Sequence, residues 1–293
     1  MYNVNTIVRR YYRLFRLHQP EGIAPLLWPG IWAITFVSHR LPSIKLLIVF
    51  TLGSIMMRAA GCILNDIIDK DFDSLVVRTR TRPIACGEMT VKQAFYAFSV
   101  LLLLSFILIV FTLNKYAIWV AICAIIPVTI YPFMKRITYW PQAFLGITFN
   151  WGVLVGWIAV QGEITFNTLI LYITCIFWTL GYDTIYAHQD KTDDILIGIK
   201  STAIRFDNGT KKWLAFFYSC VVIGLGILGY LMQLHYIYYI GLIPIICHLY
   251  WQIATLDINN VQDCRLKFMS NMGFGLIVFT TILCGKIYGY AYY

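Results

Sequence analysis

The sequence NDIIDKDFDS, residues 65–74, places four aspartates within eight positions immediately after a long apolar run. Apolar residues make up 59% of the chain and charged residues 13%, a composition typical of polytopic membrane proteins. Backbone groups in lipid must find their hydrogen-bond partners within the segment, so each apolar stretch of about 20 residues predicts a spanning helix. The acidic stretch therefore begins where a predicted span ends, so several negative charges lie next to the hydrocarbon core of the membrane.

The apolar runs predict one all-α integral membrane domain over residues 1–293, with about nine transmembrane helices around a central cavity. The predicted spans cover residues 22–39, 43–64, 93–113, 116–133, 143–160, 165–186, 213–232, 236–256 and 270–291. In this arrangement most of the 23 Lys and Arg, and all of the 14 Asp and Glu except Glu163, fall on the same side. This asymmetry predicts that the N-terminus lies inside and that the cavity opens near the cytoplasmic face. The net charge of +9 follows from the same bias and from anionic lipid headgroups, so no nucleic-acid partner is expected.

A second acidic segment, DTIYAHQDKTDDILIGIKST at residues 183–202, follows the sixth predicted span. The two segments belong to long inner loops, about 65–92 and 183–212, and long loops inside a compact domain are usually functional. When Asp69 and Asp73 are aligned with Asp190 and Asp194, both segments show an Asp-x-x-x-Asp pair followed by basic residues. The similarity predicts two related halves that face each other across one cavity.

The acids of each segment are spaced to share a helix face, because positions i and i+4 lie one above the other. Like charges stacked in this way repel, so we expect a cation between them. Carboxylate and amide oxygens suit Mg²⁺, which also takes phosphate oxygens. The candidate metal ligands are Asn65, Asp69, Asp73, Asp183, Asp190 and Asp194.

Basic residues directly downstream are candidate phosphate ligands, namely Arg78, Arg80, Arg82, Lys191 and Lys200. Neither a GxxxxGK[ST] loop nor a GxGxxG turn is present, which excludes the familiar nucleotide sites. A diphosphate held above a cavity of apolar helices indicates a lipid diphosphate whose tail lies among the spans. A cation-coupled transporter that uses the acids as an ion path is the alternative from a different functional class.

Two segments, MRAAGCILNDIIDKDFD with RTRTRP at residues 57–83 and YDTIYAHQDKTDDILIGIKST at residues 182–202, resemble the aspartate-rich motifs of the UbiA-type membrane prenyltransferases. The resemblance is greatest to the 4-hydroxybenzoate polyprenyltransferase branch, which acts in ubiquinone biosynthesis. It implies Mg²⁺-dependent transfer of a polyprenyl group from an allylic polyprenyl diphosphate to the ring carbon ortho to the hydroxyl of 4-hydroxybenzoate. A naphthoate or haem as the acceptor is the alternative within the family.

What the resemblance implies for single residues is specific. The catalytic acids would be Asp69, Asp73, Asp190 and Asp194, and the substrate ligands would be Arg58, Asn65, Asp66, Arg78, Arg82, Arg136, Lys191 and Lys200. Lys135 and Arg136, in YPFMKR, match a family motif at the mouth of the active site, and Tyr131 is a possible substrate contact. A general base for the phenol is not identified.

Four further residues near the motifs carry separate expectations. Arg58 lies within the second span, seven positions before Asn65, and a charge in a span is a functional candidate by default. We expect Arg58 to bind either the diphosphate or the carboxylate of the aromatic acid. His188 is predicted to be a surface histidine, and Asp71 and Asp193 are predicted to be either solvated or placed behind the residues that bind the ligand.

The cellular location is predicted from the N-terminal residues. The first 21 residues are basic and aromatic but poor in Ser, and no cleavable signal precedes the first span. A bacterial inner membrane is therefore expected, with a mitochondrial inner membrane as the alternative.

Overall fold

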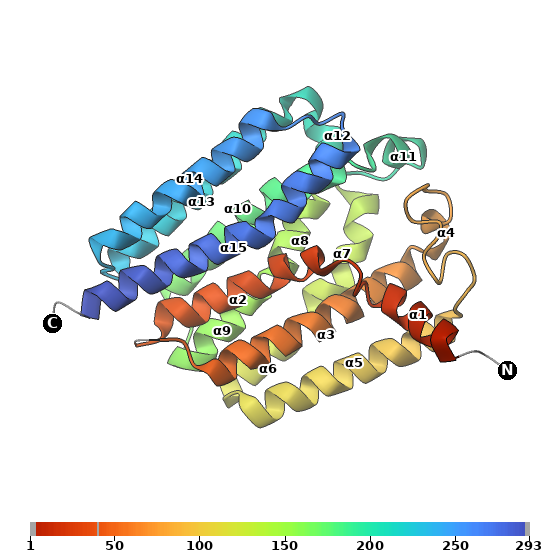
Figure 1. Ribbon diagram of the computed structural model, residues 1–293. Coiled ribbons are helices and arrows are strands. Elements are labelled where there is room, and N and C mark those ends of the chain that lie inside the picture. The colour runs from red at the N-terminus through yellow and green to blue at the C-terminus, as the bar shows by residue number, and fades with distance from the viewer. Residues whose placement is uncertain (1–3, 40, 291–293) are drawn as a thin grey trace.

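The computed structural model describes residues 4–39 and 41–290, and within these ranges it contains helices and no strands (Figure 1). Eight helical segments are long and apolar enough to cross a membrane. Five are single helices: α3 (Ile44–Ile68), α5 (Val91–Thr112), α10 (Phe166–Ala187), α14 (Tyr236–Thr255) and α15 (Val261–Tyr290). Three are interrupted: α6 (Lys115–Cys123) with α7 (Ile125–Ile137), α8 (Pro141–Phe149) with α9 (Trp151–Gln161), and α12 (Thr202–Phe206) with η2 (Asp207–Gly209) and α13 (Thr210–Leu231).

The predicted first span appears as α2 (Ala24–Val37), which is a shorter apolar helix of 14 residues. At 1.5 Å per residue it measures about 21 Å, less than the ~30 Å of a hydrocarbon core. The remaining elements are short: α1 (Val4–Leu14), η1 (Pro20–Gly22), α4 (Lys70–Asp73) and α11 (Lys191–Leu196). The all-helical membrane fold is confirmed, whereas nine full spans and an N-terminus inside remain predictions.

Two of the interruptions can be traced to single residues. Pro127 lacks an amide hydrogen and its ring crowds the carbonyl of Cys123, so the helix breaks at Ala124. At Asn150, the side-chain Nδ2 donates to Gly146 O at 2.7 Å and to Thr179 Oγ1 at 2.8 Å. The side chain thus competes for a helix carbonyl, and α8 gives way to α9.

The core lies where α2 packs against α9, α10 and α15. The buried ring of Trp32 lies 5.0 Å from that of Trp178 and 6.2 Å from that of Phe274, centroid to centroid. Close approach of α2 to α9 requires a glycine at position 156, because a Cβ there would lie 2.9 Å from the Gly30 carbonyl oxygen. Other contacts join α3 to α5 and α10 to α13.

Both acidic segments lie at the same end of the bundle, where Figure 1 shows α1, α4 and α11 together, opposite the C-terminal end of α15. Helix α3 ends at Ile68, but Asp69 N still donates to Asn65 O, and Asp73 N to Asp69 O, each at 2.8 Å. Helical spacing therefore continues through the first motif. The second predicted loop, 183–212, begins later than expected, because α10 runs on to Ala187.

Candidate active site

One cavity of about 890 Å³ is lined by residues of both acidic segments. From the first segment it is lined by Asn65, Asp66 and Asp73, and from the second by Asp183, Asp190 and Asp194. Apolar side chains of α3, α5, α7 and α9 form the rest of its wall. The cavity therefore joins a charged end to a hydrocarbon-like interior.

Arginines neutralise the acids of the first segment. Asp66 is 1% exposed, and its Oδ1 accepts from Arg16 Nη2 at 2.6 Å and from Arg82 Nη1 at 3.1 Å. Arg82 Nη1 also donates to Asp73 Oδ2 at 2.6 Å. Burial raises the pKa of Asp73 above its ordinary value, although Arg82 opposes this. The second oxygen of Asp66 is buried without a hydrogen-bond partner, so the segment retains unused acceptor capacity.

Asp69 does not line the cavity, in contrast to the stripe predicted with Asn65 and Asp73. It is fully buried, and it forms ion pairs with Lys135 and with Arg136, whose Nη2 lies 3.2 Å from Asp69 Oδ1. The backbone turns at Asp69, with φ −98° and ψ 8°, and this turn directs the carboxylate towards α7. Lys135 and Arg136 of α7 therefore neutralise Asp69, the central acid of the first motif.

The second segment is bound to the first through Arg78. Arg78 Nε donates to Asp190 Oδ1 at 2.7 Å, Nη2 pairs with the other oxygen of Asp190, and Nη1 donates to the Tyr186 hydroxyl at 2.9 Å. Burial and the neighbouring Asp190 carboxylate raise the pKa of Asp194 to about 7. Two carboxylates this close disfavour each other's ionisation, and a cation beside α11 would relieve their repulsion.

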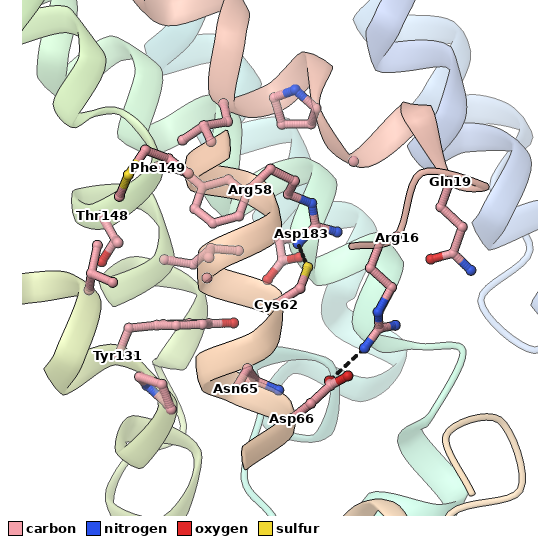
Figure 2. A pocket seen from close by; sticks show the side chains of 18 of the residues that line it. Arg16, Gln19, Arg58, Cys62, Asn65, Asp66, Tyr131, Thr148, Phe149 and Asp183 are labelled. Atoms are coloured by element: carbon pink, nitrogen blue, oxygen red, sulfur yellow. Dashed lines mark hydrogen bonds and ion pairs between the residues drawn. The ribbon is translucent and has the colours of Figure 1, made fainter. Parts of the chain in front are cut away.

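A separate group of side chains lies deeper along α3. Figure 2 shows Arg58, Cys62 and Asp183 gathered together, with Asp66 and Arg16 farther along the cavity. Arg58 Nη1 donates to Cys62 Sγ at 2.9 Å, and Arg58 Nε is buried without a partner. Among the described residues no carboxylate forms an ion pair with Arg58. The guanidinium is thus available to an anionic group in the cavity.

Two predicted substrate ligands do not line the cavity. Lys191 forms an ion pair with Asp207 instead, and Arg136 lies behind Asp69. Lys200 and Lys135 do line it, and Lys200 Nζ donates to Ile137 O at 3.1 Å. Lys191 of α11 therefore binds the η2 turn instead of the cavity, and the sequence spacing does not reveal this contact.

The UbiA prenyltransferase family model matches residues 26–277. The chain belongs to the UbiA prenyltransferase family. The chain is 44% identical over 96% of its length, and over 79% of the relative's, to "4-hydroxybenzoate polyprenyltransferase, mitochondrial" from Caenorhabditis elegans.

Solved structures share the UbiA fold at low sequence identity. The apo structure of a UbiA homologue from Aeropyrum pernix superposes with a TM-score of 0.75 at 20% identity, covering 90% of this chain and 97% of that one. A UbiA homologue from Archaeoglobus fulgidus bound to GPP and Mg²⁺ gives 0.65 at 17% identity, covering 92% and 99%. Metal and prenyl diphosphate therefore bind together in at least one protein of this fold.

The side chains that line the cavity are chemically suited to bind a hard divalent cation. They supply carboxylate and amide oxygens from both acidic segments, including the Asp66 oxygen that has no hydrogen-bond partner among the described residues. In residues 4–39 and 41–290, however, no group of three or more His, Cys, Asp or Glu is placed to hold a metal by itself. The reason is that arginines and lysines already pair with Asp66, Asp69, Asp73 and Asp190.

Two predictions are wrong. The bacterial inner membrane is contradicted, because curated relatives at 43% to 45% identity, from worm, plant, cattle and human, are named as mitochondrial. Proteins of both membranes have apolar spans and basic loops, so this pattern does not distinguish a bacterial from a mitochondrial inner membrane.

The second wrong prediction concerns His188, which is 6% exposed rather than on the surface. Its Nε2 lies 2.9 Å from Thr210 Oγ1. Burial lowers the pKa of His188 to about 4.

Other residues behave as expected or were missed. Asp71 is exposed, and neither it nor Asp193 lines the cavity. Arg16 and Gly22 line the cavity. The sequence predicts Arg16 only as one of the basic residues on the inner side, and it does not single out Gly22. Their role depends on where the N-terminal segment packs, and no local pattern reports this.

Proposed function

We propose that this protein transfers a polyprenyl group from an allylic polyprenyl diphosphate to 4-hydroxybenzoate, at the ring carbon ortho to the hydroxyl. One observation carries the proposal: the chain is 44% identical, over 96% of its length, to a 4-hydroxybenzoate polyprenyltransferase. The cavity supports it, because acids and bases from both motifs surround one end and apolar side chains line the other. The two acidic segments, which include α4 and α11, lie at one end of the bundle (Figure 1), so their acids do not make the continuous path that ion transport needs.

The diphosphate would be held by the cavity bases. Arg78, Arg82 and Lys135 each pair with a carboxylate, and Lys200 binds a backbone carbonyl. An arriving diphosphate offers these bases a stronger, multiply charged partner. When the bases bind the diphosphate, their former carboxylate partners would become free to bind a cation. The bases of the cavity would thus hold the diphosphate, and its acids would hold the metal.

We infer that the metal is Mg²⁺, held by Asp66, Asp73, Asp190 and Asp194, with Asn65 and Asp183 beside them. When bound, it would neutralise the departing diphosphate as a Lewis acid. Asp69, which is off the cavity and paired with Lys135 and Arg136, would lie behind this set.

The prenyl tail would occupy the apolar part of the cavity, along Leu102, Phe106, Ile109, Val128 and Phe149. The allylic C–O bond breaks, and the ring carbon supplies the electron pair for the new C–C bond. The proton on that carbon then leaves, and aromaticity is restored. These apolar walls exclude water, which would otherwise capture the allylic cation.

The acceptor would lie deeper, with its carboxylate on Arg58. This guanidinium lines the cavity, and it lacks a carboxylate partner among the described residues. The other bases lie at the charged end with the motif acids. One end of the acceptor is thereby anchored away from the diphosphate site.

The reaction is tested with purified protein in nanodiscs, radiolabelled 4-hydroxybenzoate, an allylic polyprenyl diphosphate and Mg²⁺. We expect lipid-extractable product that disappears with EDTA and returns with added Mg²⁺. Asp190→Asn should lower the rate at least about 100-fold, because it removes an anionic ligand of the cation. Asp71→Asn is the matched control, since Asp71 belongs to the first motif but is exposed and off the cavity. Folded wild type without product would overturn the proposal.

We also place the protein in a mitochondrial membrane, on the evidence of its relatives. Immunoblots of fractionated cells should find it in mitochondrial membranes that resist carbonate extraction. Recovery in another membrane fraction would contradict this placement.

A further inference from the structure

Gly22 is the last residue of η1, the short turn that leads into α2. It is buried and lines the active-site cavity. A Cβ atom at this position would lie 2.5 Å from Arg58 Nη2, 2.8 Å from Nε and 3.0 Å from Cζ. The guanidinium of Arg58 therefore occupies the space that a side chain at position 22 would need.

The opposite side of the guanidinium is held weakly. Its one hydrogen bond joins Nη1 to Cys62 Sγ, four residues along the same helix. Nε is buried and has no partner, and no carboxylate of the described residues fixes the group. Packing against the backbone at Gly22, together with the nearby Asp183 (Figure 2), thus sets where the charged head of Arg58 lies.

The η1 turn is held in place more firmly than the Arg58 side chain. Gly22 N donates to Gln19 O at 3.2 Å, Ile23 N donates to Pro20 O at 2.9 Å, and Glu21 lies 3.7 Å from Arg265 of α15. An arginine head is the far end of a flexible side chain, whereas this turn is tied at three points. An added methyl group would therefore displace Arg58 rather than the turn.

We propose that Gly22 is a positioning residue for the acceptor: its missing side chain seats the Arg58 guanidinium where the acceptor carboxylate binds. The inference rests on the proposed function. A planar guanidinium holds a carboxylate by two parallel hydrogen bonds, and this geometry tolerates little displacement. The η1 turn thereby becomes the wall that sets acceptor specificity.

The test is a steady-state comparison of wild type, Gly22→Ala, Arg58→Ala and the double variant. Gly22→Ala should raise KM for 4-hydroxybenzoate about 10- to 100-fold, with kcat and the donor KM nearly unchanged, because a shift of about 1 Å spoils the contact. Turnover of 4-hydroxybenzamide, which lacks the anionic group, should not change. Gly226→Ala is the matched control, since a Cβ there meets nothing within 4 Å and the residue is off the cavity.

The double variant separates positioning from general damage. An alanine at 58 has no side-chain atoms beyond Cβ for the new methyl group to meet, so Gly22→Ala should have no further effect in the Arg58→Ala background. An equal rise in acceptor KM in both backgrounds, or no rise in the single variant, overturns the inference. If Gly22→Ala does not fold, Arg58→Ala and the double variant are compared alone, and unequal acceptor KM values overturn the inference. Wild type that makes no product overturns the proposed function instead.

Discussion

Lys286, near the end of α15, is a buried basic residue that does not line the active-site cavity, and its removal yields a measurable prediction. It is 8% exposed, and its ammonium donates to the carbonyls of Thr35, at 3.1 Å, and of Phe36 and Ser38. These carbonyls belong to the C-terminal end of α2, where the last carbonyls of a helix lack intrahelical partners. The positive charge also meets the negative end of the helix dipole.

Lys286→Met removes the ammonium but keeps an apolar side chain of similar length. Carbonyls left without a partner each cost about 1–3 kcal/mol, and loss of the buried charge returns part of this. The net loss of stability should be about 2–3 kcal/mol. In a protein of this size each kcal/mol lowers Tm by roughly 2–4 °C, so a fall of about 4–12 °C is expected.

The assay is thermal unfolding in detergent, with Lys45→Met as the matched control. Lys45 is exposed at the start of α3, the helix that follows α2, so its loss removes the same charge without orphaning carbonyls. Tm of the control should stay within about 1 °C of wild type. Equal melting of Lys286→Met and wild type would refute the reasoning, and so would an equal fall in both variants.

Two predictions concern the cavity. Lys135→Met should lower kcat/KM for the prenyl diphosphate at least about 100-fold and Arg136→Met less than about tenfold, because Lys135 lines the cavity and Arg136 does not. Titration of the donor at saturating acceptor measures this, and equal losses would contradict it. Gly53→Phe should raise KM about tenfold for long-chain donors and leave geranyl diphosphate nearly unaffected, since a Cβ at Gly53 enters open cavity space. A donor-length series measures this, and equal effects on all donors would contradict it.

Much of the fold follows from local sequence. Apolar runs become helices because lipid offers the backbone no other partner, and eight segments meet the length that spanning requires. The α6–α7 break is readable from Pro127. The α8–α9 break is not, because Asn150 acts through Thr179 on another helix. The stripe of the first motif keeps its helical spacing, yet Asp69 turns from the cavity towards α7.

The sequence by itself determined that this is a helical membrane protein with two acidic motifs, since both properties reside in neighbouring residues. Tertiary structure decided which base serves which acid. Arg78 meets Asp190 across 112 positions, and Lys135 meets Asp69 across 66. It also decided that Lys191 turns to Asp207 and that Gly22 seats Arg58. Such pairings depend on which helices pack side by side, and charges whose attraction spans several ångströms choose partners by distance in space rather than along the chain.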